Sequence, residues 1–148
     1  TGLAPEQVQH KAQVISAALS HREINGDVIK LLCAVGGFEI VALSGAYIAC
    51  AQLGIPAIVD GFISSIAALA ALKLKPEIKP WLFLSHLSAE PGHKRIAEAL
   101  ELAPLLQLNM RLGEASGAAT AFPLMQLACA LHNQMATFAE AAVSNKSA

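Results

Sequence analysis

The amino-acid sequence predicts an α/β fold in which helices flank a parallel sheet, a Rossmann-like arrangement of three layers. Residues 56–61 and 80–85 are short apolar runs without the alternation of a half-exposed strand, as is typical of buried parallel strands. Residues 63–74 and 92–102 follow them with the apolar spacing of helices. Residues 105–108 form either a third short strand or the entry to a loop. The order of strand, helix, strand, helix is typical of a parallel sheet covered on both faces.

Three helical segments are expected before the first strand. Residues 5–19 carry apolar side chains at helical spacing, and residues 27–34 begin a second helix. Residues 38–53 are rich in small and apolar side chains, as in a tightly packed helix, and a glycine follows as the expected cap. The pair Gly36-Gly37 separates the second and third helices. It allows either a helix-breaking turn or the close approach of a ligand or another backbone segment.

The composition indicates one folded domain and excludes several classes of protein. Of the 148 residues, 55% are hydrophobic and 14% are charged, which excludes a disordered chain and predicts extensive burial. The 10 Lys and Arg residues balance 11 Asp and Glu residues. Such a balance produces no basic field of the kind that a phosphodiester backbone requires, so we expect no nucleic-acid partner.

The apolar stretch of residues 40–72 raises the question of a membrane span, since the mean hydropathy of the chain is +0.52. Gln52, Pro56 and Asp60 divide this stretch into pieces shorter than the roughly 20 apolar residues that a spanning helix needs. Buried cores of α/β proteins contain similar apolar runs. We therefore expect no membrane partner.

The cysteines indicate the compartment. Cys33, Cys50 and Cys129 are widely spaced, odd in number and surrounded by apolar residues. This pattern favours reduced thiols in the core over disulfides or a metal site. No secretory signal pattern begins the chain. We expect a cytoplasmic protein.

Polar residues gather where the expected strands end, and parallel sheets bind ligands beyond this edge. Asp60 and Gly61 end the first strand, where Asp60 either caps the next helix or faces a ligand. Ser85 and Ser88 frame the polar run that ends the second strand. Their hydroxyls suit either an anionic or sugar group at a helix N-terminus or ordinary N-capping.

A metal site is the alternative interpretation of the second polar run. His86, Glu90 and His93 have the spacing of one helix face. Pro91-Gly92 interrupts that spacing, because a helix does not readily continue through this pair. We expect neither a metal nor another cofactor.

The segment of residues 113–117 joins an apolar stretch to the last expected helix, residues 118–143. Its carboxylate, Glu114, is either a helix N-terminal residue favoured by the helix dipole or a general base. A general base would require Glu114 to face a largely apolar cleft, because desolvation favours the protonated form of a carboxylate. An apolar stripe from Leu124 to Phe138 runs along the last helix and fits packing on its own sheet or on a partner.

Six short motifs are spread along the chain between Thr1 and Ala118. The motifs are Thr1-Gly2-Leu3, Val35-Gly36-Gly37-Phe38-Glu39-Ile40, Val59-Asp60-Gly61-Phe62-Ile63, Ser85-His86-Leu87-Ser88, Gly92-His93 and Leu112-Gly113-Glu114-Ala115-Ser116-Gly117-Ala118. Each motif alone is weak, but their order and spacing are specific. Together they resemble the nicotinate-nucleotide:dimethylbenzimidazole phosphoribosyltransferases.

The resemblance implies a reaction and a set of site residues. Enzymes of this family transfer a phosphoribosyl group from nicotinate mononucleotide to 5,6-dimethylbenzimidazole, which yields α-ribazole 5′-phosphate for the lower ligand of cobalamin. Glu114 matches the family's catalytic base. Gly61 and Ser88 would contain the nucleotide or nicotinate, and Leu112 would pack against the benzimidazole. Further substrate-binding candidates are Gly36, Gly37, Asp60, Ser85 and Gly113.

The resemblance also implies that this chain is the C-terminal part of a longer homodimeric enzyme. Residues 1–117 would belong to the large catalytic domain, and residues 118–148 would supply a helix of a small helical domain. The family's N-terminal part supplies much of the benzimidazole pocket, so we expect the chain alone to be a poor catalyst. Two alternatives remain: a non-catalytic nucleotide-binding module, and a structural half of a split or nicked enzyme.

Overall fold

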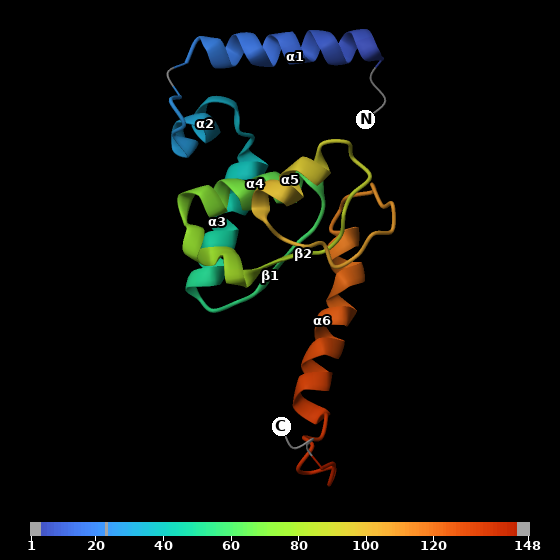
Figure 1. Ribbon diagram of the computed structural model, residues 1–148. Helices are drawn as coiled ribbons and strands as arrows, with labels where there is room; N and C mark the ends of the chain where they lie inside the picture. Colours follow the sequence, from blue (N-terminus) through green and yellow to red (C-terminus); the bar gives the residue numbers. More distant parts are fainter. Residues whose placement is uncertain (1–3, 23, 145–148) are drawn as a thin grey trace.

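The computed structural model describes residues 4–22 and 24–144, and it shows a mostly helical α/β fold with a small parallel sheet (Figure 1). The elements in chain order are α1 (Pro5–Ser20), α2 (Val28–Val35), α3 (Phe38–Gln52), β1 (Ala57–Val59), α4 (Phe62–Leu74), the 3₁₀ helix η1 (Pro76–Trp81), β2 (Leu82–Leu84), α5 (His93–Leu100) and α6 (Ser116–Gln134). The order predicted for residues 56–102 is confirmed. The motif Thr1-Gly2-Leu3 lies outside the described residues.

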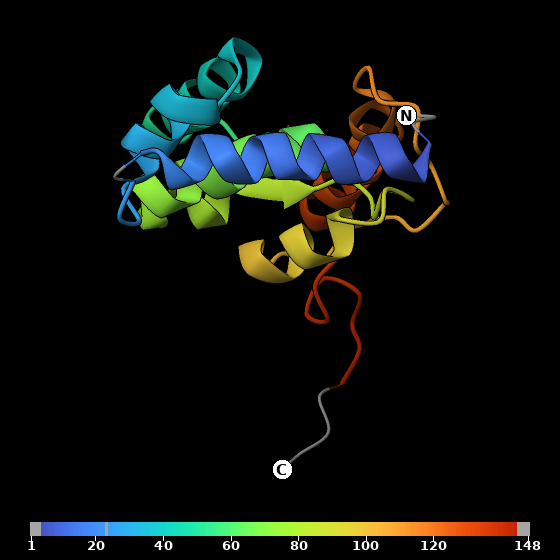
Figure 2. The same cartoon turned by 90° about the horizontal axis from the view of Figure 1, so that it is seen from above.

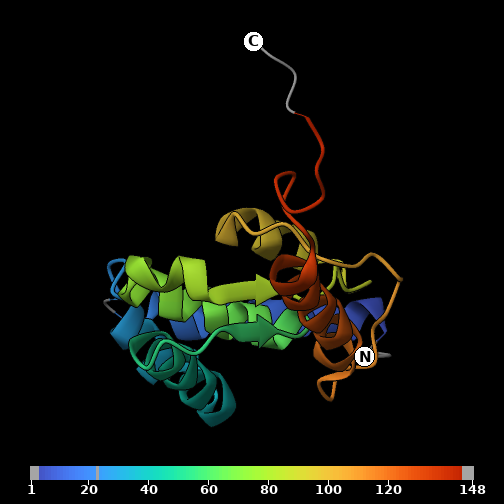
Figure 3. The same cartoon turned by 90° about the horizontal axis from the view of Figure 1, so that it is seen from below.

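The sheet is parallel, as predicted, and its strands are short. β1 pairs with β2 in a register that places Ala57 opposite Leu82 and Val59 opposite Leu84. Residues 105–108 form no third strand, although a single parallel bridge joins His86 to Leu106. Figure 3 shows both strand arrows pointing toward α6. The described part of the chain therefore contains two paired strands, and their carboxyl ends lie beside the last helix.

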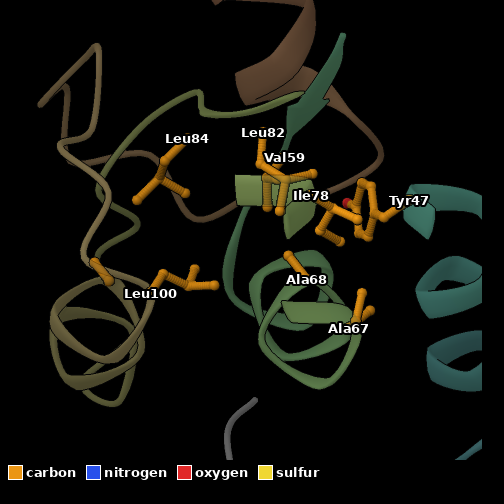
Figure 4. Close-up of a cluster of buried hydrophobic side chains, with 10 residues drawn as sticks. Tyr47, Val59, Ala67, Ala68, Ile78, Leu82, Leu84 and Leu100 are labelled. Atoms are coloured by element: carbon orange, nitrogen blue, oxygen red, sulfur yellow. The ribbon is translucent and has the colours of Figure 1, made fainter. Parts of the chain in front are cut away.

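Side chains from both strands and from α4 form the core, with contributions from α3, η1 and α5 (Figure 4). Val59 of β1 is 0% exposed and Leu84 of β2 is 1% exposed. α4 contributes Ala67, Ala68 and Ala71, which are fully buried. Their small side chains let α4 approach its neighbours closely. Burial of a side chain the size of Val59 or Leu84 contributes about 1.5–3 kcal/mol to stability.

The apolar stretch of residues 40–72 folds into α3, β1 and α4 rather than into one long helix. Gly54 follows α3 with a φ of +70°, in the left-handed region that favours glycine after a helix. Among the described residues, no helix combines the length and apolar character needed to cross a bilayer.

Burial is less extensive than the composition predicts. The accessible surface is 10440 Å², whereas a compact protein of 15.4 kDa exposes about 7,200 Å². Cys33 and Cys129 are exposed and Cys50 is half-buried, so the prediction of core thiols was wrong, although all three are free. α1 runs along the top of the molecule in Figure 1 and across its other elements in Figure 2, and it contains no buried residue.

The last helix differs from its prediction in length and in packing. α6 ends at Gln134 rather than at Val143, because Met135 adopts an extended conformation. A separate turn follows, in which Glu140 Oε2 accepts hydrogen bonds from the backbone and hydroxyl of Thr137 at 2.7 and 2.9 Å. The apolar stripe does not pack on its own sheet: Leu131 is 55% exposed and Phe138 is 65% exposed.

Candidate functional site

An open cavity of ≈ 640 Å³ lies beyond the carboxyl ends of the two strands. Its lining residues are Lys11, Asp60, Gly61, Phe62, Ile63, Ser64, His86, Ser88, Glu90, Arg111, Leu112, Gly113, Glu114 and Ala115. Segments far apart in the sequence therefore meet at one edge of the sheet. The predicted residues brought together here are Asp60, Gly61, Ser88, Leu112, Gly113 and Glu114.

Strand pairing places Asp60 and Ser85 side by side at the ends of the two strands, and Asp60 lines the cavity. The backbone N–H of Ser85 donates to Val59 O at 2.9 Å, which continues the ladder past the last paired residues. The Ser85 hydroxyl donates to Asp60 O at 2.7 Å. Ser85 is fully buried and does not line the cavity, so its hydroxyl fixes the two strand ends relative to each other.

Asp60 caps a helix other than the one that follows it. Its Oδ1 accepts a hydrogen bond from the backbone N–H of Ala118 at 2.9 Å, across 58 residues. Ala115, the N-terminal cap residue of α6, has no oxygen in its side chain with which to cap the helix itself. The alternative that Asp60 caps the next helix, α4, is therefore wrong, and its carboxylate holds the start of α6 at the cavity.

The turn that carries Glu114 is strained. Gly113, Glu114 and Ala115 have φ angles of +84°, +57° and +60°. Only glycine adopts the left-handed region without a steric penalty, so Glu114 and Ala115 each cost about 1–2 kcal/mol there. Strain of this kind persists where the surrounding structure enforces it and often marks a functional site. The turn leaves the Glu114 side chain exposed on the cavity wall.

Gly117 is a structural requirement that sequence reasoning missed. It lies in the first turn of α6 and is buried. A Cβ at this position would overlap Nδ1 and Cε1 of His86, and it would lie 2.9 Å from Asp60 Oδ1. The absence of a side chain therefore lets α6 begin directly against these two residues. The motif around Gly117 was the available signal, but the contact with His86 is not visible in it.

His93 supports the cavity wall from behind. It is fully buried, and the backbone N–H of Ser88 donates to its Nδ1 at 2.8 Å. Because Nδ1 accepts, the ring hydrogen is on Nε2, which donates to Ser65 Oγ at 2.9 Å. Burial, and secondarily the nearby His86, lower the pKa of His93 below 6.5. Both ring nitrogens are thus engaged within the protein.

The metal interpretation finds no support in the arrangement of these side chains. No group of three potential ligands gathers within residues 4–22 and 24–144. The hydroxyl of Ser88 accepts the backbone N–H of Glu90 at 3.3 Å, which is ordinary local capping. Ser88 still lines the cavity while making this bond.

Charged side chains form the rim of the cavity, and sequence reasoning missed two of them. Arg111 Nε lies 3.5 Å from Glu90 Oε1, and both side chains are partly exposed. Lys11 reaches the cavity from α1. Neither cation carried a recognisable local signal, because each reaches the site only through the fold.

Gly36 and Gly37 lie away from the cavity. They cap the C-terminus of α2 and the N-terminus of α3. A Cβ at Gly36 would lie 2.5 Å from Leu32 O, and one at Gly37 would overlap the carboxylate of Glu39. The backbone contact accounts for Gly36 at the helix junction, whereas the flexible Glu39 side chain could move away from a Cβ at Gly37. A part in substrate binding stays a prediction.

The chain matches a known protein family along almost its entire length. A family model described as phosphoribosyltransferase matches residues 1–143. A nicotinate-nucleotide–dimethylbenzimidazole phosphoribosyltransferase from Pseudomonas fluorescens is 57% identical over 149 residues, which cover 100% of this chain and 42% of that protein. A protein of the same name from Pseudomonas putida is 56% identical over 100% of this chain and 42% of its own length. The chain thus spans less than half of these relatives.

Solved structures agree with the sequence comparisons. The crystal structure of CobT from Thermus thermophilus superposes with a TM-score of 0.90 at 41% identity, covering 98% of this chain and 43% of that one. A second structure from the same organism, named as the dimethylbenzimidazole phosphoribosyltransferase, gives a TM-score of 0.87 at 40% identity over 95% of this chain and 42% of that one. The chain belongs to the phosphoribosyltransferase family whose model it matches, which confirms the resemblance in its motifs.

Proposed function

We propose that this chain forms the C-terminal part of an enzyme that transfers the phosphoribosyl group of nicotinate mononucleotide to 5,6-dimethylbenzimidazole. The products are α-ribazole 5′-phosphate, for the lower ligand of cobalamin, and nicotinate. The observation that carries the proposal is the position of Glu114 on a strained turn in the wall of the strand-end cavity. The names of the relatives at 56–57% identity agree with this reaction.

Glu114 acts as the general base. One ring nitrogen of the benzimidazole attacks C1′ of the ribose, while the bond from C1′ to the pyridinium nitrogen breaks and its electron pair leaves with nicotinate. Attack from the face opposite the leaving group inverts the anomeric centre from β to α. The carboxylate of Glu114 takes the proton from the other ring nitrogen, so the product ring is neutral. The pyridinium is already a good leaving group and needs no acid.

The other cavity residues hold the two substrates. Leu112 is 77% exposed beside Glu114, and its apolar side chain would lie against the benzimidazole ring. Gly61 and Ser88 would border the nucleotide. Lys11 and Arg111, the two cations of the lining, would bind its 5′-phosphate through charge-assisted hydrogen bonds. Orientation of the two rings then supplies much of the rate, because the chemistry needs only approach and proton removal.

The site would be completed by the part of the enzyme that this chain does not cover, which is present in the longer relatives. Glu114 is exposed and the cavity is open, whereas proton transfer from a benzimidazole requires a ring held in place. The exposed apolar side chains of α6 are available to the same segment or to a second copy in a homodimer. The completed sheet would have the three layers that the sequence predicts, with residues 1–117 in the large domain and residues 118–148 in the small one. The three free thiols fit a cytoplasmic enzyme.

A product assay tests this proposal. The completed protein is this chain joined to the segment that its longer relatives have in addition. Both the completed protein and the chain alone are incubated with the two substrates. Mass spectrometry and NMR then quantify α-ribazole 5′-phosphate and its anomeric configuration. We expect α product from the completed protein and at most traces from the chain alone. No product from the completed protein would overturn the proposed reaction, and full activity of the chain alone would overturn the need for completion.

A further inference from the structure

His86 is nearly buried in the cavity wall, yet only one of its two ring nitrogens makes a hydrogen bond within the described residues. Its side chain is 3% exposed and it lines the cavity. Nδ1 lies 3.0 Å from Ser85 Oγ, whereas Nε2 has no hydrogen-bond partner within the described ranges. Every fully enclosed polar side-chain atom in those ranges does have a partner. Nε2 must therefore retain access to the cavity.

The hydrogen bonds around His86 determine which ring nitrogen carries the proton. The Ser85 hydroxyl has one hydrogen, which it donates to Asp60 O, since a carbonyl can only accept. Ser85 Oγ must then accept from His86, so Nδ1 carries the hydrogen. In the neutral ring this leaves a lone pair on Nε2. The base of the cavity thus presents a hydrogen-bond acceptor.

Gly117 brings α6 directly against the imidazole, and Gly61 borders the ring near the end of β1. A Cβ at Gly117 would overlap the ring at Nδ1 and Cε1, so α6 packs directly against that edge. A Cβ at Gly61 would lie 3.5 Å from Cε1 and 3.8 Å from Nε2. The His86 ring therefore has little freedom to turn. Its acceptor atom, Nε2, lies beside Gly61, which has no side chain to cover it. Such a fixed acceptor is prepared for a ligand before the ligand arrives.

We propose that His86 Nε2 accepts a hydrogen bond from a ribose hydroxyl of the nucleotide, which would make His86 a specificity residue. This proposal rests on the proposed function, and the chemistry of the substrates selects the group. The phosphate and the nicotinate carboxylate are acceptors at neutral pH, and the pyridinium ring carries no N–H. The single N–H of the benzimidazole goes to Glu114. The 2′ and 3′ hydroxyls remain as donors.

A pair of substitutions separates this binding role from a structural one. His86→Asn retains a donor near the Nδ1 position for Ser85 but removes the acceptor from the cavity. His86→Gln retains an acceptor near the Nε2 position and loses the donor to Ser85. His132→Asn, at an exposed histidine of α6 outside the cavity, is the matched control. Circular dichroism checks that each variant of the completed protein is folded.

Calorimetry then measures the binding of nicotinate mononucleotide and of its 2′-deoxy and 3′-deoxy forms. We expect the wild type and His132→Asn to lose about 3- to 10-fold in affinity for one deoxy form, the range of a single neutral hydrogen bond. His86→Asn should bind the parent nucleotide correspondingly less tightly and should no longer distinguish that deoxy form. His86→Gln should retain most of the discrimination.

The outcomes distinguish this inference from the proposed reaction, because binding is measured without turnover. Equal discrimination by the wild type and His86→Asn would overturn the role of His86, even if α-ribazole 5′-phosphate is formed. Lost discrimination in His86→Asn would support that role, even if no product is formed and the transfer proposal fails. Absence of nucleotide binding by the wild type would overturn both.

Discussion

Asp60 Oδ1 accepts the backbone N–H of Ala118 at 2.9 Å, and this bond joins the end of β1 to the start of α6. The turn with Glu114 lies immediately before α6, so the same bond determines where the carboxylate stands relative to the sheet. The strained φ angles of Glu114 and Ala115 are the local cost of this connection. The candidate base is thus placed by the capping of a helix rather than by contacts of its own.

Removal of this capping bond should destabilise the protein. Asp60 is 8% exposed, and Asp60→Ala leaves the Ala118 N–H without its acceptor. We expect a loss of about 1–2 kcal/mol in the free energy of unfolding, as for other helix caps. Asp60→Asn keeps an acceptor oxygen and should lose less. Urea unfolding of the completed protein measures both, and equal stability of the Ala variant and the wild type would contradict the structural role.

A methyl group at Gly117 should be poorly tolerated, whereas one at Gly45 should not. The Cβ of Gly117→Ala would overlap the buried His86 ring, and overpacking of this kind costs about 1–3 kcal/mol. Gly45 lies within α3 with open space around it, so Gly45→Ala should stabilise by about 0.5–1 kcal/mol. Thermal unfolding of the two variants compares them directly. Similar melting temperatures for both would show that α6 does not pack against His86 as described.

Stability should depend on pH through His93. Burial lowers the pKa of His93 in the folded state, while in the unfolded chain it titrates at about 6.5. Below that pH the unfolded chain binds a proton that the folded protein excludes, so stability falls until the pH passes the folded pKa. We expect a decrease from pH 7 to pH 5.5 in the free energy of unfolding, and a smaller decrease in His93→Gln. An identical pH dependence in both proteins would contradict the assignment.

NMR titration of the imidazole Cε1 proton offers a second measurement on the same residue. The Cε1 signal of His93 should titrate with a midpoint below pH 6.5, because burial lowers the pKa of the ring and the Ser88 N–H donates to Nδ1 of its neutral form. Ser65→Ala identifies the signal and removes one of the two hydrogen bonds of the ring. A midpoint above 6.5 in the wild type would mean that the buried ring is charged.

The sequence allowed prediction of the elements that local pattern determines. The apolar runs around Ala57–Val59 and Leu82–Leu84 predicted parallel strands, and Gly54 marked the end of α3. The helix expected to reach Val143 ended at Gln134, because apolar spacing alone does not show where a helix loses its packing. Pro80 and Trp81, expected at the start of the second strand, belong instead to a short 3₁₀ helix, Pro76–Trp81.

The candidate site was predictable only in part, because its geometry depends on tertiary contacts. Strand-end position identified Asp60, Gly61 and Ser88, and the motif identified Glu114. The bond of Asp60 to α6 and the approach of Lys11 join segments far apart in the sequence, which no local pattern reports. Exposure of Cys129 was likewise not predictable, because apolar neighbours in sequence do not show which surface a helix buries.

The replacement of Glu114 by glutamine tests the central claim most directly. Glutamine keeps the size of the side chain but cannot take the benzimidazole proton, so the completed protein should lose about 10²- to 10⁴-fold in kcat. Its affinity for nicotinate mononucleotide, measured by calorimetry, should change less than about twofold, since a base acts on the proton transfer and not on nucleotide binding. Glu98→Gln, at an exposed position of α5 outside the cavity, should behave as the wild type. Unaltered turnover in Glu114→Gln would contradict the assignment of Glu114 as the base.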